Sequence, residues 1–256
     1  MLSIDRKSEI YNKFLQNKTL TIKKMAEELD VSEQTVRRDF KELEKAGIIT
    51  MFYSGAKLNE KALPTINVDF SVRQKLTLRE KEDMAKLIKD VFEEKDSIFL
   101  DNSSTVFTMI DVIKDISMTV VTNAIMVAYK FLTYSNVSTV LLGGLIDNKN
   151  KCTNDNICLE TLDKYHFNKA FISCSSVSIE KGITDSNVSI AQLRRKVMEN
   201  SETVYLLVDS TKFNKISLIH IDDFSHIDYL VTEKKPSEEW MTFLQEKEVN
   251  VIYPKE

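Results

Sequence analysis

The sequence predicts an α/β protein in which a small helical domain ending in a hairpin precedes a larger Rossmann-like α/β domain. Three observations predict this class. Residues 1–58 show helical periodicity with very short connections, and residues 74–256 contain short β-branched runs separated by helical stretches. The chain has 256 residues, of which 43% are hydrophobic, so it can bury a substantial core. Residues 59–73 contain a proline and little periodicity, which indicates a linker between the two domains.

Helices make up most of the first domain. Residues 3–18 carry apolar side chains at helical spacing. Thr21 can cap a second helix that ends near Asp30, and Ser32 can cap a third helix over residues 33–46. The short connection between the second and third helices is typical of a helix-turn-helix.

A hairpin is predicted directly after the third helix. Residues 48–50 and 56–58 are two short runs, and Ser54 and Gly55 between them predict a turn. This hairpin has the position of a wing beside the helices.

The third helix has two faces of different chemistry. Its apolar face, which we expect to pack on the first two helices, consists of Val36, Phe40 and Leu43. Its outward face consists of Gln34, Arg38, Lys41 and Lys45. Arg37 lies about 100° around the helix from Arg38, so the two adjacent arginines extend to different sides. In a DNA groove, one guanidinium can then bind a guanine edge while the other binds a phosphate.

An ordinary solvated helix face is the alternative interpretation of this charged stripe. The charge distribution favours DNA, because residues 1–57 carry 11 Lys and Arg against 9 Asp and Glu, whereas the whole chain has a net charge of −4. This net charge excludes a globally basic nucleic-acid coat. Affinity for DNA must therefore come from a local surface.

The second domain has the pattern of a parallel or mixed sheet covered by helices. Its candidate strands are residues 97–101, 118–123, 137–144, 169–174, 203–209, 228–233 and 249–253. Helical stretches lie before or between several of them, as at residues 79–94 and 124–134. This alternation predicts the Rossmann-like architecture.

Polar residues and glycines follow several of these strands, at the edge where open α/β sheets bind ligands. A hydroxyl-rich loop that could hold an anion consists of Asp101, Ser103, Ser104 and Thr105. Corresponding positions after two other strands are occupied by Thr122, Asn123, Gly143 and Gly144. Asp209 could accept hydrogen bonds from sugar hydroxyls, and Lys212 could supply a cation. The alternative is that such residues only cap helices, in a domain that serves dimerisation.

Residues 31–49, VSEQTVRRDFKELEKAGII, resemble the winged helix-turn-helix of the DeoR family of bacterial transcription regulators, which has the hallmark VSxxTxRRDLxxLExxG. The resemblance extends into the wing and through the second domain to about residue 235. It implies that operator double-stranded DNA is the partner of the first domain. The DNA-contacting residues that it implies are Ser32, Gln34, Thr35, Arg37, Arg38 and Lys41.

The same resemblance implies that the second domain is similar in fold to ribose-5-phosphate isomerase and binds a small phosphorylated sugar that alters operator affinity. Arg194 stands where the family often has lysine, so it joins the candidate effector-binding residues. In the phosphate loop of the family, Ser103 and Ser104 replace a glycine and a threonine. Asp147 and Asp155 replace an arginine and a glycine of the family pattern. A homodimer or homotetramer is expected, because one winged helix offers a small contact area for specific binding.

Other function classes have weaker support. The three cysteines and three histidines lack the spacing of a metal site, so we expect no metal and no cofactor. The sequence shows no signal peptide or membrane-spanning run, so we expect a cytoplasmic protein without a membrane partner. We expect no enzymatic activity, the alternative being an isomerase-like reaction with Asp209 and Lys212 as proton-transfer groups. A further alternative is a DNA-binding oligomer that responds to a non-sugar or redox signal through Cys152 or Cys158.

Overall fold

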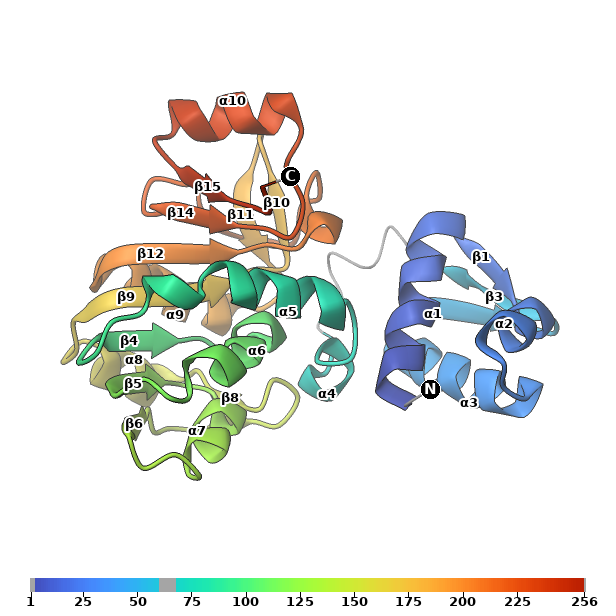
Figure 1. Cartoon of the computed structure of the whole chain (residues 1–256), viewed down its shortest axis with the longest axis horizontal. Coiled ribbons are helices and arrows are strands. Elements are labelled where there is room, and N and C mark those ends of the chain that lie inside the picture. Colours follow the sequence, from blue (N-terminus) through green and yellow to red (C-terminus); the bar gives the residue numbers. More distant parts are fainter. Residues whose placement is uncertain (1–2, 60–67, 256) are drawn as a thin grey trace. The chain divides into compact units, whose positions relative to one another are not determined.

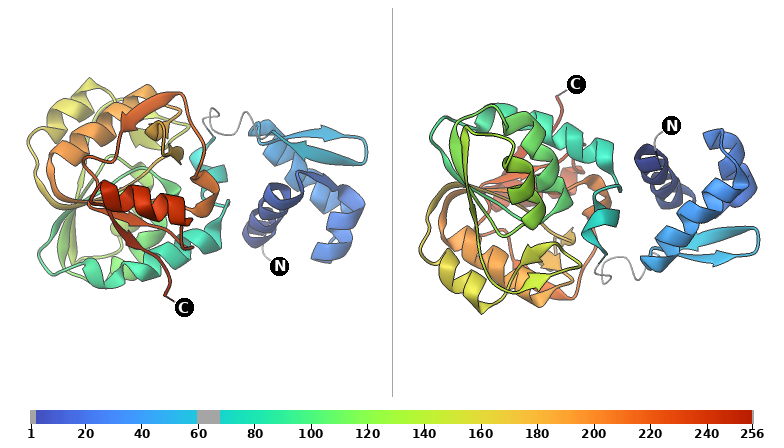
Figure 2. Two further views of the ribbon diagram at one scale, coloured as in Figure 1. Left: turned by 90° about the horizontal axis from the view of Figure 1, so that it is seen from above. Right: turned by 90° about the horizontal axis from the view of Figure 1, so that it is seen from below.

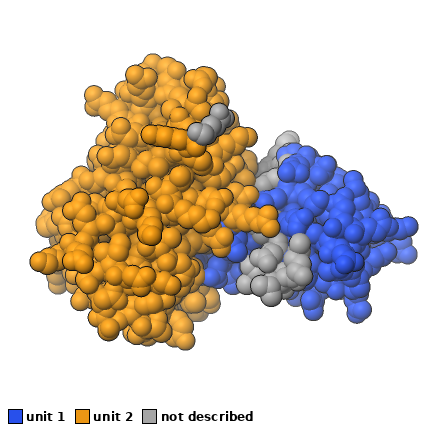
Figure 3. All heavy atoms as spheres, viewed as in Figure 1, with its two compact units in different colours: residues 1–78 blue, residues 79–256 orange. Residues whose placement is uncertain are grey.

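Two compact units make up the chain. The computed structural model describes residues 3–59 and 68–255. The chain divides into a first unit of residues 1–78 and a second unit of residues 79–256 (Figure 3). Most of the predicted linker, residues 60–67, lies outside the described residues.

The end of the predicted linker segment belongs structurally to the first unit. It forms the short helix α4 (Phe70–Arg73). Leu76 is part of the apolar core of the first unit, and Val72 packs against that core. The division between the units therefore follows Leu78, a few residues beyond the boundary at residue 74 that the sequence suggested.

The first unit combines helices with an antiparallel sheet of strand order β1-β3-β2 (Figure 1). Its longer helices are α1 (Ser3–Asn17), α2 (Ile22–Leu29) and α3 (Glu33–Lys45). Its strands are β1 (Thr19–Thr21), β2 (Ile49–Phe52) and β3 (Gly55–Leu58). These bounds confirm the predicted helix-turn-helix and the hairpin that follows it.

Capping residues set the bounds of α2 and α3, as the sequence predicted. The Thr21 hydroxyl accepts a hydrogen bond from the Lys24 amide at 3.4 Å. The Ser32 hydroxyl accepts one from the Thr35 amide at 3.2 Å. Asp30 adopts the left-handed conformation, with φ 51°, and so ends α2.

The hairpin turn consists of Tyr53 and Ser54, one residue earlier than predicted. Gly55 belongs to strand β3, where it lies opposite β1. A Cβ atom at Gly55 would lie 2.2 Å from the carbonyl oxygen of Leu20, so this close approach requires glycine. The sequence did not predict β1, because three residues are too few to show an alternating pattern.

The apolar face of α3 is buried as predicted, with Val36 and Phe40 fully inaccessible and Leu43 nearly so. The ring of Phe40 packs against that of Phe14 in α1, with the ring centres 5.2 Å apart. This packing fixes which side of α3 faces outward.

The second unit contains a seven-stranded sheet of order β15-β14-β12-β9-β4-β5-β6, in which all neighbouring strands are parallel (Figure 1). Its strands are β4 (Ser97–Leu100), β5 (Met118–Thr122), β6 (Val137–Leu141), β9 (Phe167–Ser173), β12 (Ser201–Leu207), β14 (Tyr229–Val231) and β15 (Asn250–Ile252). Each strand corresponds to a run predicted from the sequence, which confirms the α/β class.

Helices cover both faces of this sheet (Figure 2). One face packs against α5 (Leu78–Leu87), α6 (Ser104–Ile113) and α7 (Ile125–Phe131). The other packs against α8 (Asn156–Leu162), α9 (Val188–Glu199) and α10 (Glu238–Glu246). Within β4, Ile98 and Leu100 belong to the first core and Phe99 to the second, as expected for side chains that alternate along a strand.

Shorter elements complete the second unit. One 3₁₀ helix lies within the helical stretch predicted at residues 79–94, and the sequence predicted none of the others because they are too brief to show periodicity. The shorter elements are the 3₁₀ helices η2 (Lys89–Val91) and η3 (Ser210–Lys212), the paired strands β7 (Ile146–Asp147) and β8 (Cys152–Thr153), and the small sheet of β10 (Ser176–Ser178), β11 (Gly182–Asp185) and β13 (Ile219–Asp222). No helix within residues 3–59 and 68–255 is long and apolar enough to cross a membrane.

The strand order places a topological switch point between β4 and β9. From β4 the chain adds β5 and β6 on one side, and it then crosses to add β9, β12, β14 and β15 on the other. The loops that follow β4 and β9 therefore lead away in opposite directions, and open α/β sheets bind ligands in the crevice between such loops.

Candidate functional site

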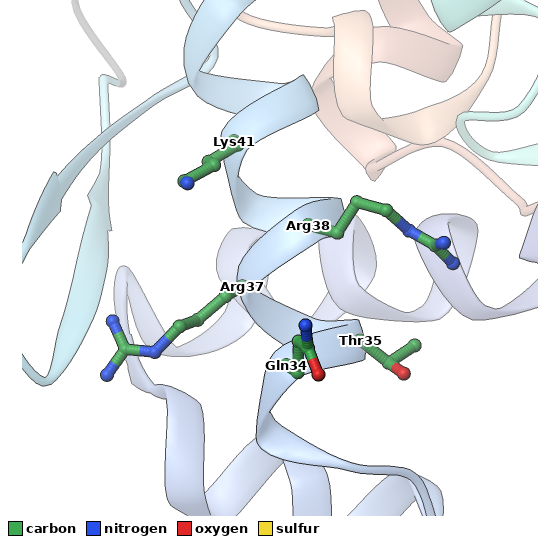
Figure 4. Close-up of a pocket in the computed structure, with 5 residues that line it drawn as sticks. All are labelled: Gln34, Thr35, Arg37, Arg38 and Lys41. Carbon is green, nitrogen blue, oxygen red and sulfur yellow. The ribbon is translucent and has the colours of Figure 1, made fainter.

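The outward face of α3 forms a shallow hollow with basic walls. It is lined by Gln34, Thr35, Arg37, Arg38 and Lys41 (Figure 4). The guanidinium groups of Arg37 and Arg38 extend to opposite sides of the helix, as their spacing predicted (Figure 4). Five of the six residues that the sequence assigned to DNA thus lie around one surface, and the sixth, Ser32, caps the start of the same helix.

Arg37 connects α3 to the wing. Both terminal nitrogens of its guanidinium donate to the carbonyl oxygen of Tyr53, each at 3.4 Å. The Tyr53 side chain at the turn is 92% exposed, so the tip of the wing presents an aromatic ring beside the basic surface. The helix and the wing can therefore contact one partner together.

A buried ion pair that the sequence did not predict holds α3 against α1. Asp39 is fully inaccessible, and Arg6 is 5% exposed. The Arg6 Nε donates to Asp39 Oδ2 at 2.6 Å, and a terminal nitrogen of Arg6 donates to Asp39 Oδ1 at 3.3 Å. Asp39 directly follows the arginine pair in the sequence, so this fork also fixes the orientation of the outward face.

In the second unit, a cluster of polar side chains lies at the switch point. Asp101 follows β4 and is fully buried. One of its carboxylate oxygens accepts from the Ser103 amide at 2.7 Å, and the other accepts from the Ser173 amide at 3.0 Å. Asp101 therefore ties the loop after β4 to the end of β9.

Arg194 of α9 is a buried cation that pairs with carboxylates of this cluster. Its side chain is 3% exposed, and it pairs with Asp101 at 2.9 Å and with Asp185 of β11. Burial lowers the pKa of the guanidinium, but the carboxylates of Asp185 and Asp101 outweigh burial and raise it above its ordinary value. Arg194 is therefore permanently charged, and its Nε and both terminal nitrogens lie against these two carboxylates.

Lys212 and Asp209 join the same cluster through Ser173. The Lys212 ammonium donates to the Ser173 hydroxyl at 2.9 Å and lies 3.6 Å from the Asp209 carboxylate. Burial alone would raise the pKa of Asp209, but the charge of Lys212, a hydrogen bond from Thr211 and the charge of Lys81 hold it below its ordinary value. Lys81 of α5, which is 3% exposed, brings a second cation that the sequence did not single out.

The loop after β4 leads into the N-terminus of α6. Ser103 caps this helix, because its hydroxyl accepts from the Val106 amide at 3.1 Å. Ser104 and Thr105 are the first two helical residues, whose amides have no carbonyl one turn earlier to bind. Both are almost completely buried. Asn102, which the sequence did not single out, is 1% exposed.

The other predicted effector residues form a second group beside β5 and β6. Thr122 donates to the Leu100 carbonyl at 2.6 Å, and the Asn123 side-chain amide donates to the Thr153 carbonyl at 2.9 Å. Gly144, with φ +126°, leaves room for Asp155. Apart from Gly143 and its two chain neighbours, no described residue has a heavy atom within 4 Å of where a Cβ of Gly143 would be.

Two aspartates that differ from the family pattern stabilise local turns. Asp155 caps α8 through the Cys158 amide at 3.1 Å and also accepts from the Leu145 amide at 3.0 Å. Asp147 accepts from the amides of Lys149 and Asn150 at 2.9 and 3.0 Å. Both carboxylates are thus engaged within the loop between β6 and α8.

The cysteines are buried, and their chemistry follows from burial. Burial raises the pKa of the Cys174 thiol to about 12 and also raises that of Cys158. Cys152 is fully inaccessible. In the part of the chain that the structure describes, His, Cys, Asp and Glu side chains form no group of three or more that could hold a metal ion.

Comparisons with known proteins assign both units. Residues 6–62 match the family model of the DeoR-like helix-turn-helix domain, and residues 77–234 match that of the DeoR C terminal sensor domain. The L-fucose operon activator of Haemophilus influenzae is 30% identical, over 89% of this chain and 91% of the relative. A putative aga operon transcriptional repressor of Escherichia coli O157:H7 is 25% identical, over 97% of this chain and 93% of the relative.

Among solved structures, ribose 5-phosphate isomerase A from Neisseria gonorrhoeae aligns with this chain at a TM-score of 0.38 and 12% identity. The alignment covers 52% of each chain.

Proposed function

The chain belongs to the DeoR family of transcriptional regulators, and we propose that it represses genes of carbohydrate metabolism until a phosphorylated sugar binds its second unit. DNA binding belongs to the first unit, and effector binding belongs to the cluster between β4 and β9. The observation that carries the effector proposal is the polar cluster at the topological switch point, where Lys212, the start of α6 and Asp101 lie together.

Operator binding uses the outward face of α3 and the wing. The side chains that contact DNA are Ser32, Gln34, Thr35, Arg37, Arg38 and Lys41. Arg38 is exposed and enters the groove, whereas Arg37 also steadies the wing through the Tyr53 carbonyl. Tyr53 itself is placed to contact the sugar-phosphate backbone. A homodimer or homotetramer presents two such surfaces to paired half-sites, which multiplies the contact area of a single winged helix.

The effector is a small phosphorylated sugar. Its phosphate accepts hydrogen bonds from the amides of Ser104 and Thr105 and is balanced by Lys212. The carboxylate of Asp209, which stays ionised near neutral pH, accepts from sugar hydroxyls. Arg194 and Asp101 hold the loop in place rather than reaching the ligand, because their polar atoms already bind each other and Asp185.

Relatives support the carbohydrate assignment, and they include both an activator and a putative repressor. One relative is named as an activator of an L-fucose operon, and another as a putative repressor of an aga operon. A ligand changes operator occupancy only if it binds the DNA-competent and DNA-incompetent arrangements with different affinity. We assign the higher affinity for the sugar to the DNA-incompetent arrangement.

Neither alternative function gains support from the side chains concerned. A redox signal needs an accessible thiolate, but Cys152 and Cys158 are buried. An isomerase would need Asp209 or Lys212 to exchange protons. The pKa of Asp209 is lowered rather than raised toward neutrality, which makes the carboxylate a weak base.

The proposal is tested with full-length protein and operators selected from random double-stranded DNA. Operator affinity is measured at fixed salt with and without hexose and pentose phosphates, their unphosphorylated parents and inorganic phosphate. We expect one or a few sugar phosphates to weaken operator binding at least about fivefold, within the usual range of allosteric coupling. Selection of no preferred sequence would contradict the DNA assignment. A specific operator whose affinity no sugar phosphate changes would contradict the effector assignment alone.

A further inference from the structure

Asn102 is a buried polar side chain whose hydrogen-bonding groups are both unused. The residue is 1% exposed, and within residues 3–59 and 68–255 neither its Oδ1 nor its Nδ2 has a hydrogen-bond partner. Polar groups inside proteins are almost always paired, because an unpaired one loses its bonds to water without replacement. No residue in the described ranges supplies a partner for the Asn102 amide, which points to a group that this unit binds.

The surroundings of Asn102 identify the kind of partner. The residue lies between Asp101 and the cap residue Ser103, directly before α6, a helix of ten residues. The Ser103 amide is held by Asp101 and the Ser103 hydroxyl caps the helix, so the backbone on this side of Asn102 is fixed. The first amides of α6, those of Ser104 and Thr105, closely follow Asn102 in the chain. An anion bound to them would therefore lie near Asn102.

A cation belongs to the same surroundings. The Asp101 carboxylate binds the Ser173 amide at 3.0 Å, and the Ser173 hydroxyl accepts from Lys212 at 2.9 Å. Ser173 therefore links Lys212 to Asp101, which directly precedes Asn102. The first amides of α6 and the Lys212 ammonium are sufficient to bind a phosphate. They give no role to the neutral side-chain amide of Asn102.

We infer that the Asn102 side chain binds a hydroxyl group of the phosphorylated sugar, beside its phosphate, and thereby determines which sugars the second unit accepts. This inference rests on the proposed effector function. A hydroxyl group both donates and accepts, so it matches a side-chain amide that offers one group of each kind. A site that hydrogen-bonds a hydroxyl group rejects an analogue without that hydroxyl much more strongly than an apolar site does, because the buried polar group is left without a partner.

The test compares the wild-type full-length chain with Asn102→Leu, which keeps a similar volume and removes both polar groups. Binding is measured by calorimetry with inorganic phosphate, with ribose 5-phosphate, glucose 6-phosphate and fructose 6-phosphate, and with the available deoxy analogues. Asn102→Ala repeats the comparison without the bulk of leucine. Asn168→Ala is the matched control, because both polar groups of Asn168 are already paired, with the Ser97 amide at 3.0 Å and with Glu202 at 3.2 Å.

We expect Asn102→Leu to weaken the best sugar phosphate about tenfold or more and to change the affinity for inorganic phosphate less than about twofold. The analogue that lacks the recognised hydroxyl should bind wild type and variant equally. Without ligand, the variant should melt no lower than wild type, since it loses no hydrogen bond. Asn168→Ala should melt lower and bind the sugar phosphate as wild type does.

Three results would overturn the inference. Equal sugar-phosphate affinity of wild type and both Asn102 variants would mean that the amide holds only water. Equal losses for the sugar phosphate and for inorganic phosphate would make Asn102 a part of the phosphate site or of the loop's folding. Absence of any sugar-phosphate binding by wild type would instead refute the proposed effector class, and the inference with it.

Discussion

Replacing Asp39 by alanine should destabilise the first unit severely, although the substitution removes no apolar contact. Asp39 is fully inaccessible, and its carboxylate receives two hydrogen bonds from Arg6, at 2.6 and 3.3 Å. Asp39→Ala leaves the Arg6 guanidinium, which is 5% exposed, without a counter-charge. Breaking a buried ion pair in this way costs about 3–5 kcal/mol.

The loss is large for a unit of this size. In a domain of 60–100 residues, each 1 kcal/mol lowers the melting temperature by roughly 4–8 °C, so the variant should melt more than about 12 °C lower. Circular dichroism of the full-length chain during heating measures this change. Lys24→Ala is the control, because Lys24 is 70% exposed and 3.8 Å from its partner Glu28, and exposed pairs contribute little.

A double variant separates lost pairing from lost packing. Arg6→Met combined with Asp39→Leu removes both charges, so it should recover much of the stability that Asp39→Ala loses. If Asp39→Ala cost less than about 1 kcal/mol, water would have to reach the pair, and its role in fixing α3 would be refuted.

Three further predictions concern the two sites. Arg38→Ala should weaken operator binding by about 1–3 kcal/mol without lowering the melting temperature, and unchanged affinity at matched salt would place this arginine outside the groove. Gly144→Ala should cost about 1–3 kcal/mol of stability, because Gly144 has φ +126° and a Cβ there would lie 2.1 Å from Asp155 Oδ1. Gly143→Ala is the control and should cost little. Equal melting temperatures of the two variants would contradict this difference. The pKa of Asp209 is lowered on folding, so its contribution to stability is complete above the unfolded pKa of about 3.9 and disappears as pH falls through the folded pKa. Asp209→Asn should therefore reduce the loss of stability in acid, and an unchanged pH dependence from pH 5 to 2 would show that the carboxylate has the same pKa in both states.

Local patterns were sufficient to predict the architecture. The apolar spacing of Val36, Phe40 and Leu43 determines which side of α3 is buried, and side chains such as Thr21 and Ser32 cap helices through neighbours three residues away. Central strands of the large sheet carry consecutive apolar residues, such as Ile98, Phe99 and Leu100 of β4, because both faces of the sheet are covered there. Such signals lie within a few residues of one another, so they can be recognised without knowledge of the fold.

Local sequence patterns could not predict which charged side chains pair with each other. Arg6 and Asp39 are 33 residues apart, and Arg194 and Asp101 are 93 residues apart, yet each pair is buried together. The family resemblance made Arg194 a candidate effector-binding residue, and only the structure shows its ion pairs with Asp101 and Asp185. The same holds for Asn102, whose neighbours along the chain give no sign that both of its polar groups are buried and lack a partner among the described residues. The sequence by itself determined the elements and their order, because periodicity and capping act within a few residues. Only the tertiary structure decided which polar groups satisfy one another and which stay unpaired within the described residues, because that depends on where distant segments meet.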